Sequence, residues 1–515
     1  MPLSAGRRLA AVAGLVLAAC TPVALPRASP TASHSATAGR LHLLEAEDVQ
    51  TLDPALIDDP VSLAVGTEMF EGLTSLDPSG RPQPGLAERW EVTDRATTYT
   101  FHLRDVRYQS GTTVRSQDAI TDWSRALSPA LNSPLAVFFK PLGASHVGDR
   151  LAGLTAVDDR TLRIHLAAPD SELLSLLAYP PYWLFDPGTS GAVPSGSGPY
   201  RLAQWKSGRD LEFEANPGYW GPAPRMTRVR IDIEPDPARR LDLFSRGSVD
   251  IVHSLSGPQL LDFSRTPANR GRVHLAPVAR TTWLGFNTVA GSGYGPQERM
   301  AIAQAIDRRL LTDLVFAGSQ QARPAADFLP PAVPGHLDRS LPAFDPQAAR
   351  RSLDQSGFTG PIDLYYSTNP TVGRVATDLK DQLEANTGRT VSLHPLGDFF
   401  SQASLDHLPL VIDTWSADLA YPADILDNVL RGGAQFNDLH LADPRIDRAL
   451  DEGRTAPDLA KALTAYQQAE AAAIDDSRVI PLYSGAEPYL VRNGISLTFT
   501  DGPSPFLWES VSEQR

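Results

Sequence analysis

Cys20 is the only cysteine among the 515 residues of the chain. A single thiol excludes an intramolecular disulfide and any metal site built from several cysteine ligands. The fold must therefore be held together by burial of apolar side chains, and a chain of this length has enough of them to form a sizeable core. At roughly 150 residues per domain, the length predicts two to four domains.

The residues before this cysteine have the pattern of a secretion leader. Two arginines at 7–8 precede an apolar run over 9–19, which is too short to span a bilayer core that needs about 20 residues. Residues 17–20 (Leu-Ala-Ala-Cys) resemble the bacterial lipobox, in which a peptidase cuts before the cysteine and the thiol carries a diacylglycerol. We expect a lipoprotein signal peptide over 1–19 and lipidation of Cys20; the alternative is an ordinary signal peptide with a chance cysteine.

The segment after the cysteine differs in composition from the rest of the chain. Residues 20–40 are rich in Thr, Pro, Ala and Ser and contain almost no large apolar side chains. Such a segment buries too little surface to order itself, so we expect a disordered tether. With a lipid on Cys20 anchoring one end of this tether, the folded body would lie on the outer face of the membrane.

The charge balance narrows the classes of partner. Acidic residues number 60 and basic residues 46, which gives a formal net charge of −14. Nucleic acid binding needs a basic surface, so we expect no nucleic acid partner. Only four of the basic residues are lysines, and together with the many Ala, Gly and Pro residues this bias indicates a high-GC bacterium. Hydrophobic residues at 42% and charged residues at 21% are typical of globular proteins.

Residue periodicity predicts a mixed α/β body. Residues 99–103 alternate between apolar and polar side chains, and 162–166 repeat that pattern, which is typical of half-buried strands. Apolar residues at helical spacing predict a helix over 119–127, with Ser116 placed to cap it. Strand, helix and strand follow one another over 361–413, which predicts a βαβ unit in a parallel sheet.

An i, i+4 ladder of four apolar side chains predicts one helix over 299–317, with Gly318 as its C-cap. The ladder consists of Ile302, Ile306, Leu310 and Leu314.

The sequence carries no motif of a known catalytic or cofactor site. G-x-S-x-G, G-x-x-x-x-G-K-[ST] and H-E-x-x-H are all missing from it. The eleven histidines include no pair at i, i+3 or i, i+4, so a helical metal site is excluded as well. We expect a protein that is not an enzyme and that holds no metal or cofactor.

A series of short motifs, in a fixed order, resembles the family 5 extracellular solute-binding proteins, the peptide- and oligopeptide-binding lipoproteins of ABC importers. Each motif is weak alone, and the order of the set makes it specific. The departures are Ser110, where the family has Asp, and Gln117-Asp118-Ala119 in the following helix. The motifs are Thr51-Leu52-Asp53-Pro54-Ala55, Glu71-Gly72-Leu73-Thr74, Leu86-Ala87-Glu88-Arg89-Trp90, Tyr99-Thr100-Phe101-His102-Leu103-Arg104, Gly196-Ser197-Gly198-Pro199-Tyr200, Asn216-Pro217-Gly218-Tyr219-Trp220-Gly221, Gly285-Phe286-Asn287-Thr288, Ala305-Ile306-Asp307-Arg308, Trp415-Ser416-Ala417-Asp418 and Ile480-Pro481-Leu482-Tyr483.

The resemblance implies an α/β, two-lobed periplasmic-binding-protein-like fold of type II, with an extra subdomain in the first lobe. We expect the first lobe over 41–280, with the subdomain over about 65–190. The second lobe would span 281–482, and 483–515 would return to the first. A ligand would bind between the lobes and be enclosed by hinge closure, without any bond being made or broken. The implied partners are a peptide or other small solute and the ABC permease subunits, and we expect a monomer.

The resemblance also implies site residues. In peptide-binding members the aspartate of the motif at 415–418 pairs with the ligand's α-ammonium, which falls here on Asp418. A carboxylate in a closed, dry cleft is a strong partner for a cation. The alternative is that Asp418 caps a helix beginning near Pro422. Leu419 and Ala420 depart from the residues that the family often has next, which weakens the peptide assignment.

The other candidate residues could have a structural role instead of a role in ligand binding. Trp415 and Trp283 would form cleft walls or belong to the core. Asn287 would contact ligand or backbone near the crossover between lobes. Thr51, Leu52 and Asp53 would offer backbone groups to an extended peptide. No motif selects a partner for a peptide C-terminus.

Two kinds of functional alternative stay open. The same fold could bind a nickel chelate, an oligosaccharide or another small solute. A sensor or surface lipoprotein without a transport role is the alternative from a different class.

Overall fold

The computed structural model describes residues 39–189, 193–287, 293–316, 320–339, 341–397, 408–500 and 504–513. The chain divides into a unit Met1–Ser35, outside the described residues, and a unit Ala36–Arg515, to which everything below refers. The expected signal peptide, Cys20 and nearly all of the tether therefore lie outside the described residues. Among the described residues, no helix is both long and apolar enough to cross a bilayer.

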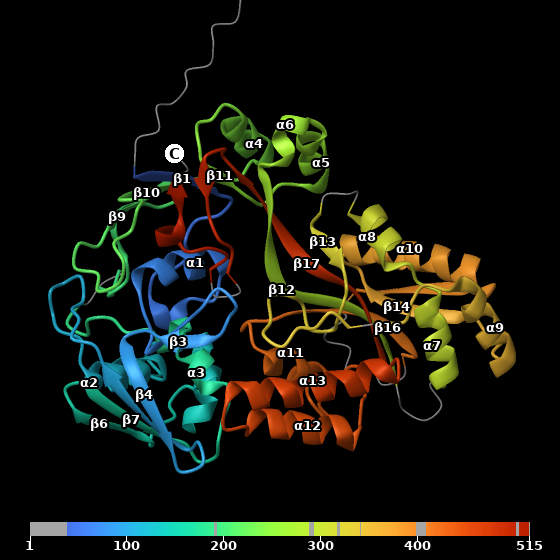
Figure 1. The fold of residues 1–515 in the computed structure, drawn as a ribbon, viewed down its shortest axis with the longest axis horizontal. Coiled ribbons are helices and arrows are strands. Elements are labelled where there is room, and N and C mark those ends of the chain that lie inside the picture. Colours follow the sequence, from blue (N-terminus) through green and yellow to red (C-terminus); the bar gives the residue numbers. More distant parts are fainter. Residues whose placement is uncertain are drawn as a thin grey trace, which may run out of the picture. The chain divides into compact units, whose positions relative to one another are not determined.

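A mixed sheet of 11 strands forms the centre of the described structure (Figure 1). Its order is β15-β14-β16-β12-β17-β11-β1-β10-β9-β8, and β13 pairs with β17 off this path. The neighbours of β1 and of β14 in this order are parallel to them, and the other pairs are antiparallel. The strands are β1 (Arg40–Glu45), β8 (Tyr200–Lys206), β9 (Asp210–Ala215), β10 (Arg228–Ile233), β11 (Ile251–Val252), β12 (Val273–Phe286), β13 (Ala322–Pro324), β14 (Ile362–Ser367), β15 (Val391–Leu396), β16 (Leu410–Ser416) and β17 (Val479–Val491).

The two longest strands, β12 and β17, join the two halves of this sheet. They run antiparallel beside each other (Figure 1). Residues 273–277 of β12 pair with β17 next to β11, and residues 281–285 pair with it next to β16. The register slips between Pro277 and Thr281. Such a slip bends a strand and ends regular pairing locally, so the two halves of the sheet meet at 278–280.

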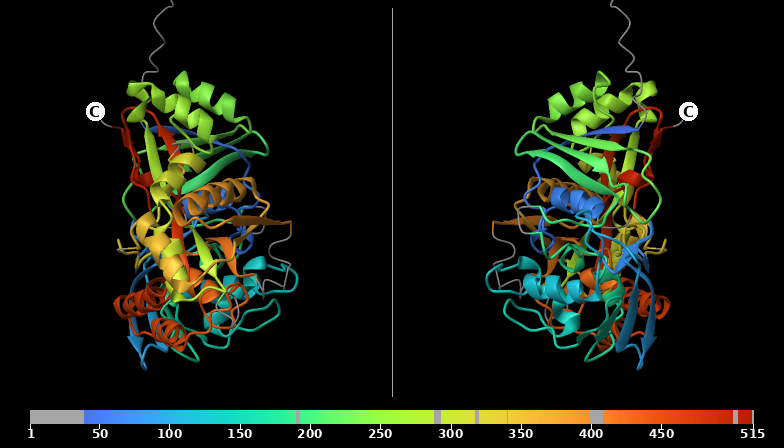
Figure 2. Two further views of the ribbon diagram at one scale, coloured as in Figure 1. Left: turned by 90° about the vertical axis from the view of Figure 1, so that its right-hand side faces the viewer. Right: turned by 90° about the vertical axis from the view of Figure 1, so that its left-hand side faces the viewer.

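A separate four-stranded antiparallel sheet, in the order β4-β5-β7-β6, follows the first strand in the chain. Its strands are β4 (Ala87–Thr93), β5 (Thr98–Leu103), β6 (Leu154–Asp158) and β7 (Thr161–His165). Tyr99, Phe101 and Leu103 are buried while their neighbours are half-buried, which confirms the predicted alternation. Figure 2 shows these strands, in blue and cyan, at the same end of the molecule as the helices of residues 444–475.

The predicted helix of this region is α2 (Ser116–Ala126), and its buried Trp123 packs edge-on against Tyr182 at 5.1 Å. The predicted cap was wrong by one residue. Arg115 is the N-cap, and its amide donates to the carboxylate of Asp118 at 2.8 Å. The hydroxyl of Ser116 instead donates to the Asp158 carbonyl, so a long-range contact takes this side chain away from the helix end.

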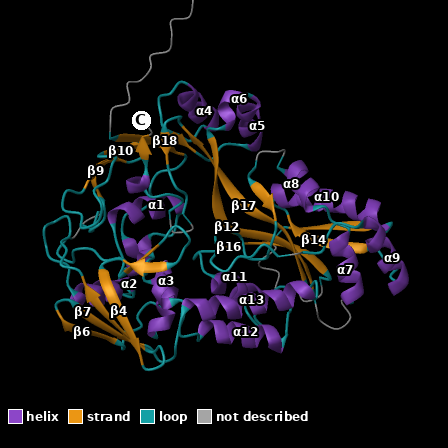
Figure 3. Ribbon diagram, viewed as in Figure 1, coloured by secondary structure: helices purple, strands orange, loops and turns teal. Residues whose placement is uncertain are grey.

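Helices cover the sheets (Figure 3). The remaining α-helices are α1 (Pro60–Met69), α3 (Leu173–Leu176), α4 (Pro237–Ser245), α5 (Gly257–Arg265), α6 (Pro267–Arg270), α7 (Pro296–Gln304), α8 (Arg308–Val315), α9 (Pro346–Ser356), α10 (Pro370–Thr387), α11 (Pro422–Val429), α12 (Pro444–Arg454) and α13 (Leu459–Asp475). The short elements are η1 (Pro54–Leu56), η2 (Pro134–Leu142), η3 (Pro180–Tyr182), η5 (Trp508–Ser510), and the strand pairs β2 (Thr74–Leu76) with β3 (Pro82–Pro84) and β18 (Ile495–Ser496) with β19 (Ser512–Glu513).

The predicted single helix over 299–317 is two helices, α7 and α8. Asp307 separates them, because its carboxylate accepts the amides of Arg309 and Leu310 at 3.0 Å and so begins a new helix. Leu310 and Leu314 are 43% and 60% exposed, so the apolar ladder does not continue into α8. The predicted cap, Gly318, lies outside the described residues. The βαβ prediction is confirmed, since β14 and β15 are parallel and α10 connects them.

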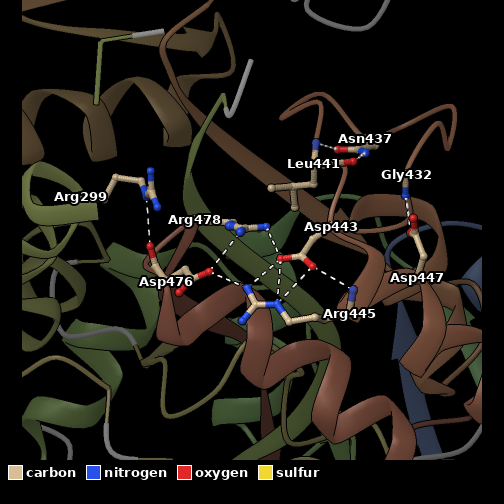
Figure 4. Close-up of polar contacts among 9 residues, drawn as sticks. All are labelled: Arg299, Gly432, Asn437, Leu441, Asp443, Arg445, Asp447, Asp476 and Arg478. Atoms are coloured by element: carbon tan, nitrogen blue, oxygen red, sulfur yellow. Dashed lines mark hydrogen bonds and ion pairs between the residues drawn. The ribbon is translucent and has the colours of Figure 1, made fainter. Parts of the chain in front are cut away.

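An ion network fixes the α12–α13 pair to the start of β17 (Figure 4). Asp443, the N-cap of α12, accepts the Arg445 amide at 2.8 Å and pairs with the guanidinium groups of Arg445 at 2.7 Å and Arg478 at 2.8 Å. Asp476, which follows α13, pairs with the same two arginines at 2.8 and 3.0 Å, and its carbonyl accepts from Arg299 on α7. Four elements are thereby cross-linked at one point.

Candidate functional site

A charged surface lies where the register of β12 and β17 slips. Arg280 is exposed, and its Nε donates to the Ser416 hydroxyl of β16 at 2.9 Å. Gly485 of β17 faces the same place, since a Cβ there would lie 3.2 Å from the Cβ of Arg280 and 3.6 Å from that of Val278. A glycine at this position lets the two strands approach closely at the slip.

Asp418 follows β16 at the edge of this surface. The Ala417 amide donates to the Ala279 carbonyl at 2.8 Å and so extends the ladder between β16 and β12 by one residue. Asp418 is the next residue of the chain, in the bend that follows this ladder. The side chain is exposed, and among the described residues its carboxylate forms no hydrogen bond or ion pair.

The competing helix-cap role for Asp418 does not fit the geometry. The N-cap of α11 is Tyr421, without a side-chain cap bond. Asp424, in the first turn of α11, accepts from Trp415 Nε1 at 3.0 Å and from the Leu419 amide at 2.9 Å. Asp424 therefore organises this turn, and the Asp418 carboxylate is left available. Partial burial raises the pKa of Asp418, so its surroundings are less polar than bulk water.

The two tryptophans have different environments. Trp415 is half-buried, is held by Asp424, and packs edge-on against Phe436 at 5.0 Å. Trp283 is fully buried and packs edge-on against Phe328 at 5.1 Å. Its Nε1 has no hydrogen-bond partner among the residues that the structure describes. Of the two roles expected for Trp283, cleft wall and core, the structure shows the core role. Contact with a ligand would require a rearrangement around this side chain.

Asn287 is also buried. Its amide donates to the Pro409 carbonyl at 3.2 Å, directly before β16 begins. This residue therefore joins the end of β12 to the start of β16.

Residues 51–53 are engaged within the chain. The amides of Thr51 and Asp53 donate to Ser62 Oγ at 3.3 Å and to Thr51 Oγ1 at 3.1 Å, and Leu52 is fully buried. The Asp53 carboxylate forms an ion pair with Arg125 of α2. Two of the three amides expected to face an extended peptide are thus already paired, and that role stays a prediction.

The sequence reasoning missed a half-buried charge cluster on the other side of the slip. His253 Nε2 lies 2.7 Å from a Glu45 carboxylate oxygen, its Nδ1 lies 3.6 Å from Glu487 of β17, and its ring stacks on Tyr489. Burial by itself lowers the pKa of His253, but the charges of Glu45 and Glu487 and their hydrogen bonds outweigh it and raise the pKa to about 10. The ring is therefore an imidazolium at neutral pH.

This cluster lies at the carboxyl ends of the parallel strands β1 and β11, beside a cavity of about 100 Å³. Glu45, His253 and Tyr489 line it together with apolar side chains that include Val65 and Trp508. In open α/β sheets, ligands bind outside the carboxyl ends of such strands. A histidine directly after the short apolar pair Ile251-Val252 was the available signal.

The comparison with protein families decides the family. Residues 81–437 match the model of the bacterial extracellular solute-binding proteins, family 5. The chain belongs to this family. Family 5 consists of solute-binding proteins, and the resemblance seen in the motifs is confirmed.

Relatives in family 5 match most of the chain. The oligopeptide-binding protein OppA of Bacillus subtilis (strain 168) is 26% identical over 466 residues, which cover 84% of this chain and 85% of OppA. The periplasmic oligopeptide-binding protein OppA of Escherichia coli (strain K12) is 26% identical over 479 residues, covering 86% and 87%. The probable deoxycholate-binding periplasmic protein YgiS of the same organism is 24% identical over 473 residues, covering 85% and 86%.

Solved structures of family 5 proteins share the fold. The periplasmic murein tripeptide binding protein MppA in its unliganded open form has a TM-score of 0.84 at 23% identity, covering 93% of this chain and 98% of MppA. NikA from Brucella suis in complex with Fe(III)-EDTA has a TM-score of 0.74 at 22% identity, covering 92% and 100%. The architecture is therefore the α/β, two-lobed periplasmic-binding fold expected from the sequence, with the additional four-stranded sheet.

Proposed function

We propose that the chain is the extracytoplasmic binding protein of an ABC importer and that it captures peptides beside Asp418. The observation that carries this proposal is an exposed carboxylate with no hydrogen bond or ion pair among the described residues. It lies two residues after Ser416, whose hydroxyl Arg280 contacts. The α-ammonium of a peptide supplies the missing partner, and a charge-assisted hydrogen bond to it strengthens as water is excluded. The names of the two OppA relatives support an oligopeptide as the ligand.

Closure of the two lobes would enclose the ligand. We place the first lobe at 41–280 and 483–515, with the subdomain at about 65–190, and the second lobe at 281–482. The register slip at 278–280 and Gly485 opposite it support a hinge there. A second MppA structure has a TM-score of 0.65, against 0.84 for the open form, which supports reading this conformation as open.

Delivery would occur at the outer face of the cell membrane. In this proposal the peptide is passed to the ABC permease subunits by a monomer anchored through a diacylglycerol on Cys20 and the tether at 20–40. The lipobox-like end of the leader supports the anchor. Intact-mass measurement of the membrane-extracted protein tests it, because an unmodified Cys20 would remove the anchor from the proposal.

A second candidate ligand is a metal chelate. The likeness to NikA in complex with Fe(III)-EDTA favours this alternative to a peptide. The decisive experiment is mass spectrometry of the ligand that co-purifies with the protein. A peptide supports the main proposal, whereas a chelate or an oligosaccharide replaces it. Peptide uptake that persists after deletion of the gene would favour a sensor role without transport.

A further inference from the structure

A second pocket, with a volume of about 330 Å³, lies between the subdomain and helix α11. Its subdomain wall comes from η2 and from the residues around α3. Part of the lining is apolar and includes Phe138, Leu176 and Leu419. The polar part of the lining includes Glu172 and Asp427. The Asp418 carboxylate is not part of this lining, so the pocket is distinct from the peptide site proposed above.

Glu172 is the unusual residue of this pocket. It is only 9% exposed, and its amide donates to Asp170 at 2.9 Å, but among the described residues its carboxylate receives no hydrogen bond. Burial, followed by the charge of Asp170, raises the pKa of Glu172 to about 8, although Arg454 acts in the opposite direction. A buried carboxylate without a donor is unfavourable unless a proton or a cation accompanies it.

The arginines around the pocket are already engaged. Arg454 lies 3.8 Å from Asp170 and 3.6 Å from Asp427, and Arg431 pairs with Asp427 at 2.8 Å and with Asp451 at 2.7 Å. Neither comes within ion-pair distance of Glu172. Lys140 is exposed, and among the described residues it forms no ion pair. The lining holds three carboxylates, of Glu172, Asp424 and Asp427, and three cationic side chains, of Lys140, Arg431 and Arg454. Both arginines are already paired with aspartates, whereas the Glu172 carboxylate has no such partner in the part of the chain that the structure describes, so the space beside Glu172 favours a positive guest.

We propose that this pocket binds a small organic cation, a primary ammonium or guanidinium on a short aliphatic body. The charge would lie against Glu172, and the aliphatic part would lie against Phe138, Leu176 and Leu419. Burial of such a stem beside a paired head group is the usual way in which long cationic groups bind. A metal ion fits less well, because the described residues contain no cluster of three or more metal-ligating side chains.

The cation would also bridge two parts of the fold. Close to the pocket, the Ser171 amide of the subdomain donates to the Arg454 carbonyl at 2.8 Å, and the Tyr421 hydroxyl donates to Ser171 Oγ at 2.9 Å. A guest that touches Glu172 on one side and Asp427 on the other adds to this contact. Its binding therefore stabilises the arrangement of subdomain and α11 seen here.

Isothermal titration of the purified protein with 1,5-diaminopentane tests the proposal. We expect binding, a loss of affinity of about tenfold or more in Glu172→Gln, and a gain of a few fold in Lys140→Gln, because that change removes a competing positive charge. Asp418→Asn should leave diamine binding unchanged, and Glu172→Gln should leave the binding of a peptide without lysine or arginine unchanged. The proposed peptide function and this site can therefore fail independently.

Further arms keep the test decisive. Thermal unfolding of Glu172→Gln shows whether the variant is folded, and Glu172→Asp, which keeps the charge, should retain part of the affinity. The cation could be a free amine or the side chain of a bound peptide. If the affinity for a lysine-containing peptide falls in both Glu172→Gln and Asp418→Asn, and the diamine does not bind, the cation is the side chain of a bound peptide. Amine binding that is unaffected by Glu172→Gln, or no binding of any amine, overturns the proposal.

Discussion

The guanidinium Nε of Arg280 donates a hydrogen bond to the hydroxyl of Ser416 at 2.9 Å, from β12 to β16, at the point where the register of β12 against β17 slips. This contact places a positive charge next to the turn that carries Asp418. It thereby joins β12 to the end of β16, two residues before the ligand candidate Asp418.

Replacement of Asp418 by Asn should weaken the binding of peptides with a free amino terminus by roughly tenfold or more, which is about 1.4 kcal/mol. The amide keeps the shape but not the charge that pairs with the ammonium. Calorimetry with a free and an N-acetylated peptide measures the effect. The affinity for the acetylated peptide should be the same in wild type and in Asp418→Asn. Asp262→Asn on α5, an exposed change of the same charge, serves as the control. Equal affinity of wild type and Asp418→Asn would remove this residue from the site.

Trp283 distinguishes a core role from a ligand role. Trp283→Phe should change the free energy of unfolding by less than about 1.5 kcal/mol, because it keeps an aromatic ring and removes an N–H that has no partner. Trp283→Ala should cost about 3–5 kcal/mol through the cavity it leaves. Denaturant unfolding and peptide titration test both variants. A loss of affinity in a stable Trp283→Phe variant would show that the indole contacts the ligand.

Gly485→Ala should disturb the join between the lobes. The added Cβ would lie 3.2 Å from the Cβ of Arg280, so β12 has to shift at the slip, at a cost of about 1 kcal/mol or more in stability. We expect a smaller ligand-induced change in radius of gyration, measured by small-angle scattering, and weaker peptide binding. Gly271→Ala is the matched control, since no atom lies within 4 Å of its added Cβ. The same scattering change in both variants would argue against a hinge at this position.

His253 should make stability depend on pH in the alkaline range. Its pKa in the folded protein is about 10, above the reference value of 6.5. Its contribution is therefore fully present below pH 6.5 and is lost as the pH rises through about 10. His253→Gln should lower the free energy of unfolding at pH 7 by about 1–3 kcal/mol, because two half-buried carboxylates lose a charged hydrogen-bond partner. Urea unfolding at pH 7, 9 and 10.5 should show the difference from wild type shrinking, and a constant difference would contradict this assignment.

Asp443 should make the free energy of unfolding depend on pH in the acidic range. Hydrogen bonds from Arg445, together with the charge of Arg478, lower the pKa of Asp443 to about 2 despite burial, below the ordinary value of 3.8. Its contribution is present above pH 3.8 and is lost as the pH falls through about 2. Asp443→Asn should cost about 1–2 kcal/mol at pH 7, from the weakened cap and ion pairs. The difference from wild type in unfolding experiments should vanish near pH 2, and its persistence there would rule out this role.

Local patterns predicted several elements well. The alternation at 99–103 and the strand–helix–strand order at 361–413 are properties of short segments, and both are present in the structure. The prediction of a single helix over 299–317 was wrong because Asp307 caps a new helix. The spacing of apolar residues carries no information about a capping residue between them. Ser116 failed as a cap because its hydroxyl found a partner 42 residues away.

The candidate site could be predicted only in part. Asp418 was found through a motif, and the structure shows its carboxylate unengaged. The cluster of Glu45, His253 and Glu487 has no local signature, because these residues are separated by 208 and 234 positions. Parallel pairing of β1 with β11 and the passage of β17 beside them bring the three together.

The sequence by itself determined the family, the α/β class and the identity of one candidate ligand residue, since motifs and periodicity are carried by contiguous residues. Only the tertiary structure decided that Trp283 is buried, that Asp424 rather than Asp418 holds the turn before α11, and that Glu172 faces a pocket against a helix some 250 residues later. The physical reason is that burial and the pairing of charges depend on which distant segments pack together, and no single stretch of sequence contains that information.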